Sequence, residues 1–149
     1  MSSTTAAGSK LAISAGKPTA QTEAAYTELT YTSVGGVESI GGFGATTEVV
    51  TFTPLDGPVE KYKGPTNYGQ LSPNMKVDDS DAGQALIQTA SAPKNTELYA
   101  FRVTKPDGSL RFFQARVFGF PETIGAANSV ITATPAIEIC TEVIKKAAA

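Results

Sequence analysis

The sequence predicts a mainly β protein, an antiparallel β-sandwich or barrel with one flanking α-helix. Three observations lead to this fold class: a β-branched run at Thr46–Thr53, a hairpin turn at Lys105–Gly108, and a helix start signal at Asp78–Asp81. The chain has 149 residues, of which 41% are hydrophobic and 17% charged. This size fits one domain, which we expect to span residues 1–149.

The composition excludes several classes of function. The net charge is −2 with 12 basic residues, which disfavours a protein that grips nucleic-acid phosphates. Histidine is absent and there is one cysteine, so the usual general base, an internal disulfide and a multi-cysteine zinc site are all excluded. We therefore expect a protein that is not an enzyme and has no cofactor, metal or small-molecule ligand. We also expect no membrane span and no secretory signal, because long apolar runs are absent.

The first 25 residues read as an N-terminal arm. This segment is rich in Ser, Thr and Ala, and its apolar content is a short alternation at Leu11 and Ile13. Such a segment offers little apolar surface against the entropy of ordering. We expect the arm to be disordered in an isolated monomer unless something outside the domain holds it.

Two strands are predicted next, over residues 30–37 and 46–53, on either side of a glycine-rich turn. Neither face of the second strand is strongly apolar, so we expect it to be covered on one side only. The Gly42-x-Gly44 spacing runs into a strand rather than a helix, which argues against a phosphate-binding loop and for a hinge or turn.

Residues 54–75 read as a long inter-strand loop. This stretch has four prolines and no periodicity, which is unusual inside a compact domain unless the loop is functional or disordered. Its residues Tyr62, Tyr68 and Leu71 argue against disorder. We expect a loop that binds a partner, with packing on its own domain as the equal alternative.

The acidic stretch before residue 82 predicts a helix that ends before Pro93. Asp79 or Ser80 would accept hydrogen bonds from the first backbone N–H groups, and Asp78 adds favourable charge. The expected apolar stripe consists of Ala82, Ala85, Leu86, Thr89 and Ala90. A calcium loop starting at Asp78 would need an acidic ligand where Thr89 stands, so we prefer helix capping.

The segment around residues 98–118 predicts a β-hairpin with a defined register. A type I turn with glycine in the left-handed position pairs Lys105 with Ser109. Phe101 then lies opposite Phe113 on a core-like face, and Arg102 opposite Phe112 on a mixed polar face. That polar face, with Gln114 and Arg116, is either a solvated surface or a ligand surface.

The last apolar stretch predicts a strand pair over 129–133 and 136–144, or one strand broken at Pro135. Ile137 and Ile139 would share the inner face, and Glu138, Cys140 and Glu142 the outer one. Cys140 has no histidine or basic residue beside it in sequence, so we expect an inert thiol.

Four features occur in order along most of the chain. They are Tyr26-x-x-Leu29-x-Tyr31-x-x-Val34-Gly35-Gly36-Val37, the turn through Gly44, Asp81-x-Gly83-Gln84-x-x-Ile87 and the hairpin Leu98–Phe118. In this order of elements, more than in any single motif, the chain resembles the major tail tube proteins of long-tailed bacteriophages and of related gene transfer agents.

The resemblance implies a structural virion protein with the phage tail tube fold. Six subunits would form a ring, and rings would stack into a hollow tube whose inner sheets join into a continuous barrel. DNA would pass through the lumen without specific binding. The partners would be further copies of the chain, a tape-measure protein and tail tip or terminator proteins. The protein would be made in the host cytoplasm and end in the virion tail.

The same resemblance suggests which residues carry assembly. The expected contacts between subunits or rings are Leu11, Ile13, Tyr62, Tyr68, Leu71 and Ile144. The expected lumen-facing residues are Arg102, Gln114 and Arg116 of the hairpin, or Glu138 and Glu142 of the last strand. Arginine side chains on the lumen wall would attract the phosphates of DNA that must slide along it, unless each arginine is paired with a carboxylate.

The sequence leaves two alternative functions open. One is a small β-sandwich carbohydrate-binding module, although the stacking tryptophan usual in such modules is absent. The other is a different virion component of the same fold, such as a tube terminator or the inner tube of a contractile tail. A binding module should stay monomeric and bind glycans, whereas a tube protein should self-assemble.

Overall fold

A computed structural model describes residues 5–147 and confirms a mainly antiparallel β architecture in that range. The largest sheet has seven strands in the order β2-β1-β8-β9-β12-β6, with β13 also paired to β9. Its strands are β1 (Lys10–Ser14), β2 (Thr32–Ser33), β6 (Gln70–Leu71), β8 (Tyr99–Thr104), β9 (Leu110–Gly119), β12 (Ala136–Ile139) and β13 (Ile144–Lys146). Every pairing in this sheet is antiparallel.

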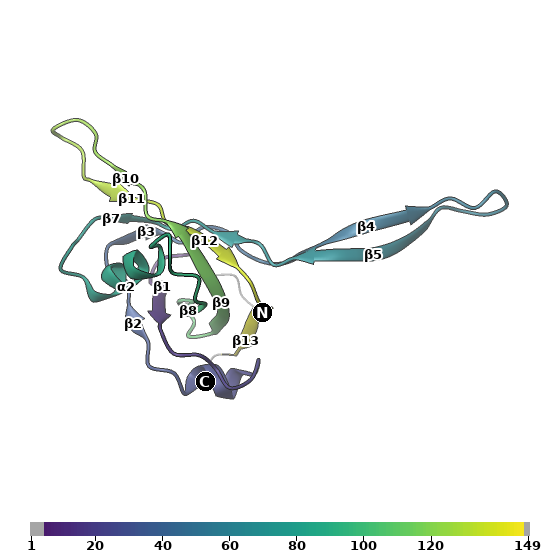
Figure 1. Cartoon of the computed structure of the whole chain (residues 1–149), viewed down its shortest axis with the longest axis horizontal. Helices are drawn as coiled ribbons and strands as arrows, with labels where there is room; N and C mark the ends of the chain where they lie inside the picture. Colours follow the sequence, from purple (N-terminus) through teal and green to yellow (C-terminus); the bar gives the residue numbers. More distant parts are fainter. Residues whose placement is uncertain (1–4, 148–149) are drawn as a thin grey trace.

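Two smaller sheets and two helices complete the described part of the chain. A four-stranded sheet has the order β10-β11-β7-β3, and β4 pairs with β5 as a separate two-stranded ribbon. The strands are β3 (Val37–Ser39), β4 (Thr46–Phe52), β5 (Glu60–Asn67), β7 (Asn74–Lys76), β10 (Glu122–Thr123) and β11 (Thr132–Ala133). The helices are α1 (Glu23–Thr27) and α2 (Ala82–Ala90). Figure 1 shows the β4–β5 ribbon projecting far from the rest of the molecule.

Both faces of the seven-stranded sheet are covered. On one face Phe101 and Phe113 stack at 5.6 Å between ring centroids, within the main core that α2 closes through Ile87. On the other face Tyr26 of α1 stacks on Phe112 at 5.5 Å. Adjacent residues of β9 thus enter two different cores, because successive side chains of a strand point to opposite faces.

The β8–β9 hairpin has the predicted register. Phe101 lies opposite Phe113 and Arg102 opposite Phe112. In the turn, the N–H of Gly108 donates to the carbonyl of Lys105 at 2.9 Å, and Gly108 has a φ of +93°. The expectation of an open polar face is wrong at Arg102 and Gln114, where α1 and Tyr31 cover that side of the hairpin, whereas Arg116 on the same face is exposed.

The N-terminal arm over residues 1–25 is also corrected where it is described. Residues 10–14 form β1 inside the large sheet, between β2 and β8, and Leu11 and Ile13 are 1% and 0% exposed. Two apolar side chains suffice here because the core of the same chain receives them. Residues 1–4 of the arm lie outside the described residues.

The long loop expected over residues 54–75 is replaced by β5, β6 and β7 with short connections. Pro65 is tolerated within β5 because β5 pairs with β4 on one side only. The predicted strand over residues 30–37 is likewise divided into β2 and β3.

Helix α2 begins where the acidic stretch predicts, but its cap and its buried face differ. Asp81 is the N-cap, and its carboxylate accepts hydrogen bonds from Gln84 N at 2.9 Å and Gly35 N at 3.0 Å. The buried residues are Gly83, Gln84, Ile87 and Ala90, so the expected stripe is correct only at Ala90. An added side chain at Gly83 would collide with the backbone of Ser33, so glycine is what lets α2 lie against β2.

Candidate assembly surfaces

The β4–β5 ribbon exposes apolar side chains on both of its faces. The register places Val50 opposite Tyr62 and Phe52 opposite Glu60 on one face. Phe52 is 60% exposed and Tyr62 57% exposed. The other exposed apolar residues of the ribbon and its tip are Val49, Leu55 and Val59. An isolated two-stranded hairpin is marginally stable in water, so such a surface is typical of an element that packs against a partner.

The ribbon leaves the body at a close backbone crossing. A Cβ at Gly69 would lie 2.5 Å from the carbonyl oxygen of Gly44, and both glycines have positive φ, +91° and +140°. Asn67 braces this root, because its side-chain oxygen accepts a hydrogen bond from Gly69 N at 2.8 Å. The expected hinge or turn at the Gly42-x-Gly44 motif is therefore part of the ribbon's attachment.

A second projecting segment links β10 to β11. Figure 1 shows this loop extending from the body on the side away from the ribbon. It exposes Ile124, Val130 and Ile131, and Phe118 at the end of β9 is 65% exposed. The described chain therefore presents apolar surface at two distant places.

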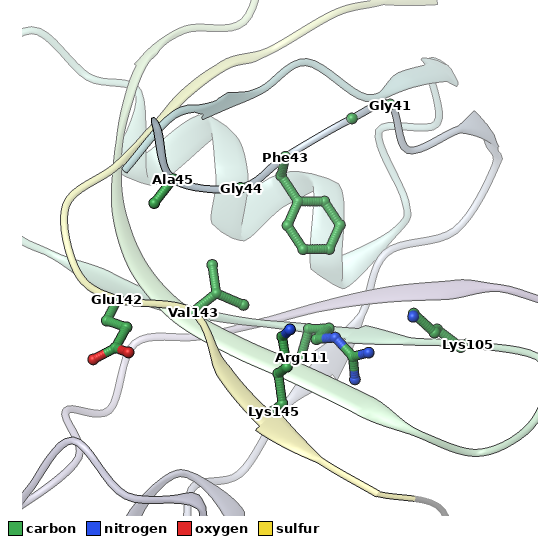
Figure 2. Close-up of a pocket in the computed structure, with 10 residues that line it drawn as sticks. Gly41, Phe43, Gly44, Ala45, Lys105, Arg111, Glu142, Val143 and Lys145 are labelled. Carbon is green, nitrogen blue, oxygen red and sulfur yellow. The ribbon is translucent and has the colours of Figure 1, made fainter. Parts of the chain in front are cut away.

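A recess of about 610 Å³ lies beside the root of the ribbon (Figure 2). Its apolar lining includes Phe43 and Val143, and Figure 2 shows these two side chains directed toward one another. Arg111 and Lys145 are cross-strand neighbours on β9 and β13 and line the same recess, with Lys105 beside them. The recess therefore joins an apolar floor to a cationic rim.

The residues expected to contact other subunits divide into two groups. Leu11, Ile13 and Leu71 are buried in the main core of their own chain, so the expectation that they form contacts is corrected. Their burial stabilises the subunit instead. Tyr68 is half-buried against that core and Ile144 against the Tyr26 cluster. Tyr62 lies on the ribbon with its ring exposed, and its hydroxyl donates to Glu60 at 2.8 Å.

The residues expected to face a lumen divide in the same way. Gln114 is buried, and its side chain accepts a hydrogen bond from Gln21 at 3.2 Å. Arg102 lies over the Tyr31 ring at 4.8 Å, beneath the segment that follows α1. Gln114 is thus buried inside the subunit and Arg102 is half-buried against Tyr31, which corrects the expectation that they face a lumen.

Arg116, Glu138 and Glu142 remain accessible to different degrees. Arg116 and Glu142 are exposed and Glu138 is half-buried. Arg116 lies opposite Glu138 on neighbouring strands, and its Nε donates to the carbonyl of Thr96 at 2.8 Å. Its Nη1 lies 3.5 Å from the Cys140 sulfur, so Cys140, which has no basic residue beside it in sequence, has one beside it in space.

The residues that sequence reasoning missed are those of the ribbon's exposed strand and of the recess. The sequence does indicate an unusual strand at Val49, Val50 and Phe52, because these apolar residues fall on both faces of the strand. A strand in a sheet that is covered on one side normally has apolar residues on one face only. No sequence pattern indicates the recess, because the residues that line it come from four separate segments of the chain. Among the described residues, no group of three or more acidic, histidine or cysteine side chains could hold a metal ion. No helix in that range is long and apolar enough to cross a membrane.

Comparison with known proteins shows that this chain shares its fold with chains of tails and of contractile injection systems. Neither the family models nor the curated proteins contain a match. Among solved structures, the chain is similar to one from the PVC extracellular contractile injection system, described as a sheath/tube terminator in the extended state. That match has a TM-score of 0.73 and 10% identity, and it covers 99% of both chains.

Two further structures share the fold. A chain from the baseplate of the anti-feeding prophage aligns with a TM-score of 0.68 and 12% identity, over 98% of this chain and 97% of the other. A chain from the tail of an empty GTA particle aligns with a TM-score of 0.65 and 15% identity, over 92% and 96%. These structures belong to tail and injection assemblies, and at such identities the similarity establishes the fold.

Proposed function

We propose that this protein is a structural subunit of a phage-type tail, whose copies form hexameric rings that stack into a hollow tube. The exposed β4–β5 ribbon carries the proposal. Its apolar side chains Val49, Val50 and Phe52 are 63%, 47% and 60% exposed, and packing against a neighbouring subunit would remove them from water. The shared fold supports the same conclusion.

The mode of assembly follows from the shape of the subunit. The ribbon projects on one side, and it would pack on a different surface of the next copy. Contacts between two different surfaces are head-to-tail, and such contacts close into rings or continue as filaments. Both results are needed for a stacked tube.

Transport through such a tube would be physical. DNA would slide along a wall that does not bind it, with Arg116, Glu138 and Glu142 as lumen-facing candidates. Glu138 lies opposite Arg116 on the neighbouring strand, and its negative charge would weaken the electrostatic attraction of that arginine for DNA phosphates. A tape-measure protein and tail tip or terminator proteins would complete the assembly in the virion, after synthesis in the host cytoplasm.

The first test is negative-stain electron microscopy of the purified protein at high concentration, with light scattering on the same sample. Hollow filaments or six-membered rings are the expected result. Monomers that persist across concentration and salt, combined with tight binding on a glycan array, would replace this proposal with a carbohydrate-binding module.

A tube terminator is the second candidate. The similarity to the structure described as a sheath/tube terminator supports it, with a TM-score of 0.73 over 99% of both chains. The sheath-tube complex of the same injection system gives 0.63 over 93% and 88%. A terminator should form single rings that do not stack, so the length of the particles in the same micrographs separates the two candidates.

A further inference from the structure

We infer that the recess beside the ribbon root receives the tip of the β4–β5 ribbon from a second copy of the chain. This inference rests on the proposed function, because it names which surfaces meet when copies assemble. The tip is the segment 54–58, Pro-Leu-Asp-Gly-Pro, and the recess is the one lined by Phe43, Val143 and the three cations described above.

Within residues 5–147 the cations of the recess have a nearby carboxylate but form no ion pair. Hydrogen bonds from Ser109 lower the pKa of Asp107 most, and the charges of Lys105 and Arg111 lower it further. The side chains of residues 5–147 form one ion pair, between Lys17 and Glu97 at 3.0 Å, so none includes Lys105, Arg111 or Lys145. Glu142 also lines the recess, but Figure 2 shows its carboxylate pointing away from the Phe43 ring.

A nearby turn carboxylate is already engaged. Asp107 accepts hydrogen bonds from both the N–H and the hydroxyl of Ser109, at 2.9 and 2.6 Å. Arg111 uses one of its five donors on the carbonyl of Leu110 at 3.0 Å. The rim therefore has positive charge and free donors for an incoming carboxylate.

The tip of the ribbon has matching chemistry. Leu55 is fully exposed and Asp56, next to it, is exposed as well. The leucine side chain suits the floor formed by Phe43 and Val143, and the aspartate suits the cationic rim. Pro54 and Pro58 flank the tip and restrict its backbone, which reduces the entropy lost on docking.

The tip cannot fill the recess of its own chain. Leu55 lies nine residue steps along the chain from Thr46, a span of roughly 30 Å at about 3.3 Å per step in extended chain. Gly44 and Ala45, at the root, line the recess themselves. Each copy therefore presents its recess at the root of its ribbon and its tip at the far end, which is the arrangement of a repeating head-to-tail contact.

The other projecting loop matches the recess less well. Its apolar residue Ile124 is exposed, but Glu122 lies in β10 at the root of that loop and pairs with Ala133. The loop itself, residues 124–131, contains no acidic residue. Glu122 thus supplies a matched control for charge-reversal experiments.

The first experiment is a charge exchange between tip and rim. Asp56→Lys and Lys145→Glu should each raise the protein concentration needed for assembly about tenfold, because each places like charges together. The double variant should recover most of the loss. Glu122→Lys should leave that concentration within about twofold of the wild-type value. Thermal melts of the monomers check that all variants fold, since the three side chains are exposed.

The second experiment is a site-specific cross-link in a Cys140→Ser background. Copies carrying Asp56→Cys and Lys145→Cys should form a ladder of disulfide-linked multimers when assembled protein is oxidised. Copies carrying Glu122→Cys and Lys145→Cys should not.

The outcomes separate this inference from the function on which it rests. Wild-type tubes together with no rescue in the double variant and no ladder would overturn the tip-to-recess contact and leave the tube proposal standing. A wild-type protein that stays monomeric under all conditions would overturn both. Rescue and a ladder from the tip pair alone are the results expected.

Discussion

The two long hairpins of this protein are both pairs of antiparallel strands, and they have opposite environments. In the β8–β9 hairpin, Phe113 is fully buried and both faces are covered. In the β4–β5 hairpin, Phe52 is 60% exposed, and every residue of the two strands except Gly64 is exposed. Local pairing is therefore not what distinguishes a core element from an assembly element. The distinction is whether the rest of the chain supplies something to cover the hairpin.

The largest expected difference comes from truncating one phenylalanine in each hairpin. Phe113→Ala should lower the free energy of unfolding by about 3–5 kcal/mol, because it removes a stacked ring from the main core. Phe52→Ala should change the free energy of unfolding of the monomer by about 0.5 kcal/mol or less, yet impair assembly. Urea unfolding of the two variants measures this difference. A large loss of monomer stability in Phe52→Ala would mean that the ribbon packs on its own body.

The second contrast between body and ribbon is a buried side-chain amide in the body, because no side chain of the ribbon's two strands is buried. Gln84 is fully buried, and its Nε2 donates to the carbonyls of Gly35 and Lys76, both at 2.8 Å. Its Oε1 accepts from the N–H of Asp78 at 3.0 Å. Gln84→Leu should lower the free energy of unfolding by about 2–3 kcal/mol, since it leaves buried backbone groups unpaired.

The same substitution one turn along α2 is the control. Gln88 is half-buried and donates no side-chain hydrogen bond within the described residues, so Gln88→Leu should be nearly neutral. Chemical denaturation of both variants tests this pair. Equal losses would show that the helix, rather than the amide, is what leucine disturbs.

The junction between body and ribbon provides a third test. Gly69→Ala should lower the free energy of unfolding by about 1–3 kcal/mol, because it strains a φ of +91° and crowds the Gly44 carbonyl. Gly42→Ala meets open space within 4 Å and should be close to neutral. Thermal melts of both variants, followed by assembly assays, show whether ribbon orientation matters more than stability. A tolerated alanine at Gly69 would contradict the close crossing.

The smallest expected effect is a change in the free energy of unfolding at alkaline pH, and the tyrosines that cause it lie in the body and not in the ribbon. Burial raises the pKa of Tyr31, against a smaller lowering by Arg102, and burial also raises the pKa of Tyr26. The folded state therefore holds these phenols neutral at a pH where the unfolded chain ionises them. Their contribution to stability is complete below about pH 10 and is lost as pH rises above that value.

Tyr31→Phe should flatten this alkaline loss of stability, which urea midpoints measured between pH 8 and pH 11 would reveal. An unchanged slope in the variant would show that Tyr31 ionises alike in the folded and unfolded chains.

Sequence reasoning succeeds where the deciding contacts are local. The turn at residues 105–108 sets the register of β8 against β9, and the acidic stretch marks the start of α2, because neighbouring residues supply both interactions. It fails at β5, where Gly64, Pro65 and two lysines give no alternating pattern. The pairing of that strand comes from β4, whose β-branched side chains and backbone supply a template.

The amino-acid order alone thus carries the mainly antiparallel β fold, the β8–β9 register and the start of α2, since each depends on residues close together in the chain. Only the tertiary structure decides that Leu11 and Ile13 lie in a core, because their partners on β8 are some 90 residues away. The tertiary structure also brings Phe43, Arg111 and Lys145 to one recess and leaves the ribbon uncovered. Burial depends on what the whole chain places around a residue, and a local pattern does not contain that information.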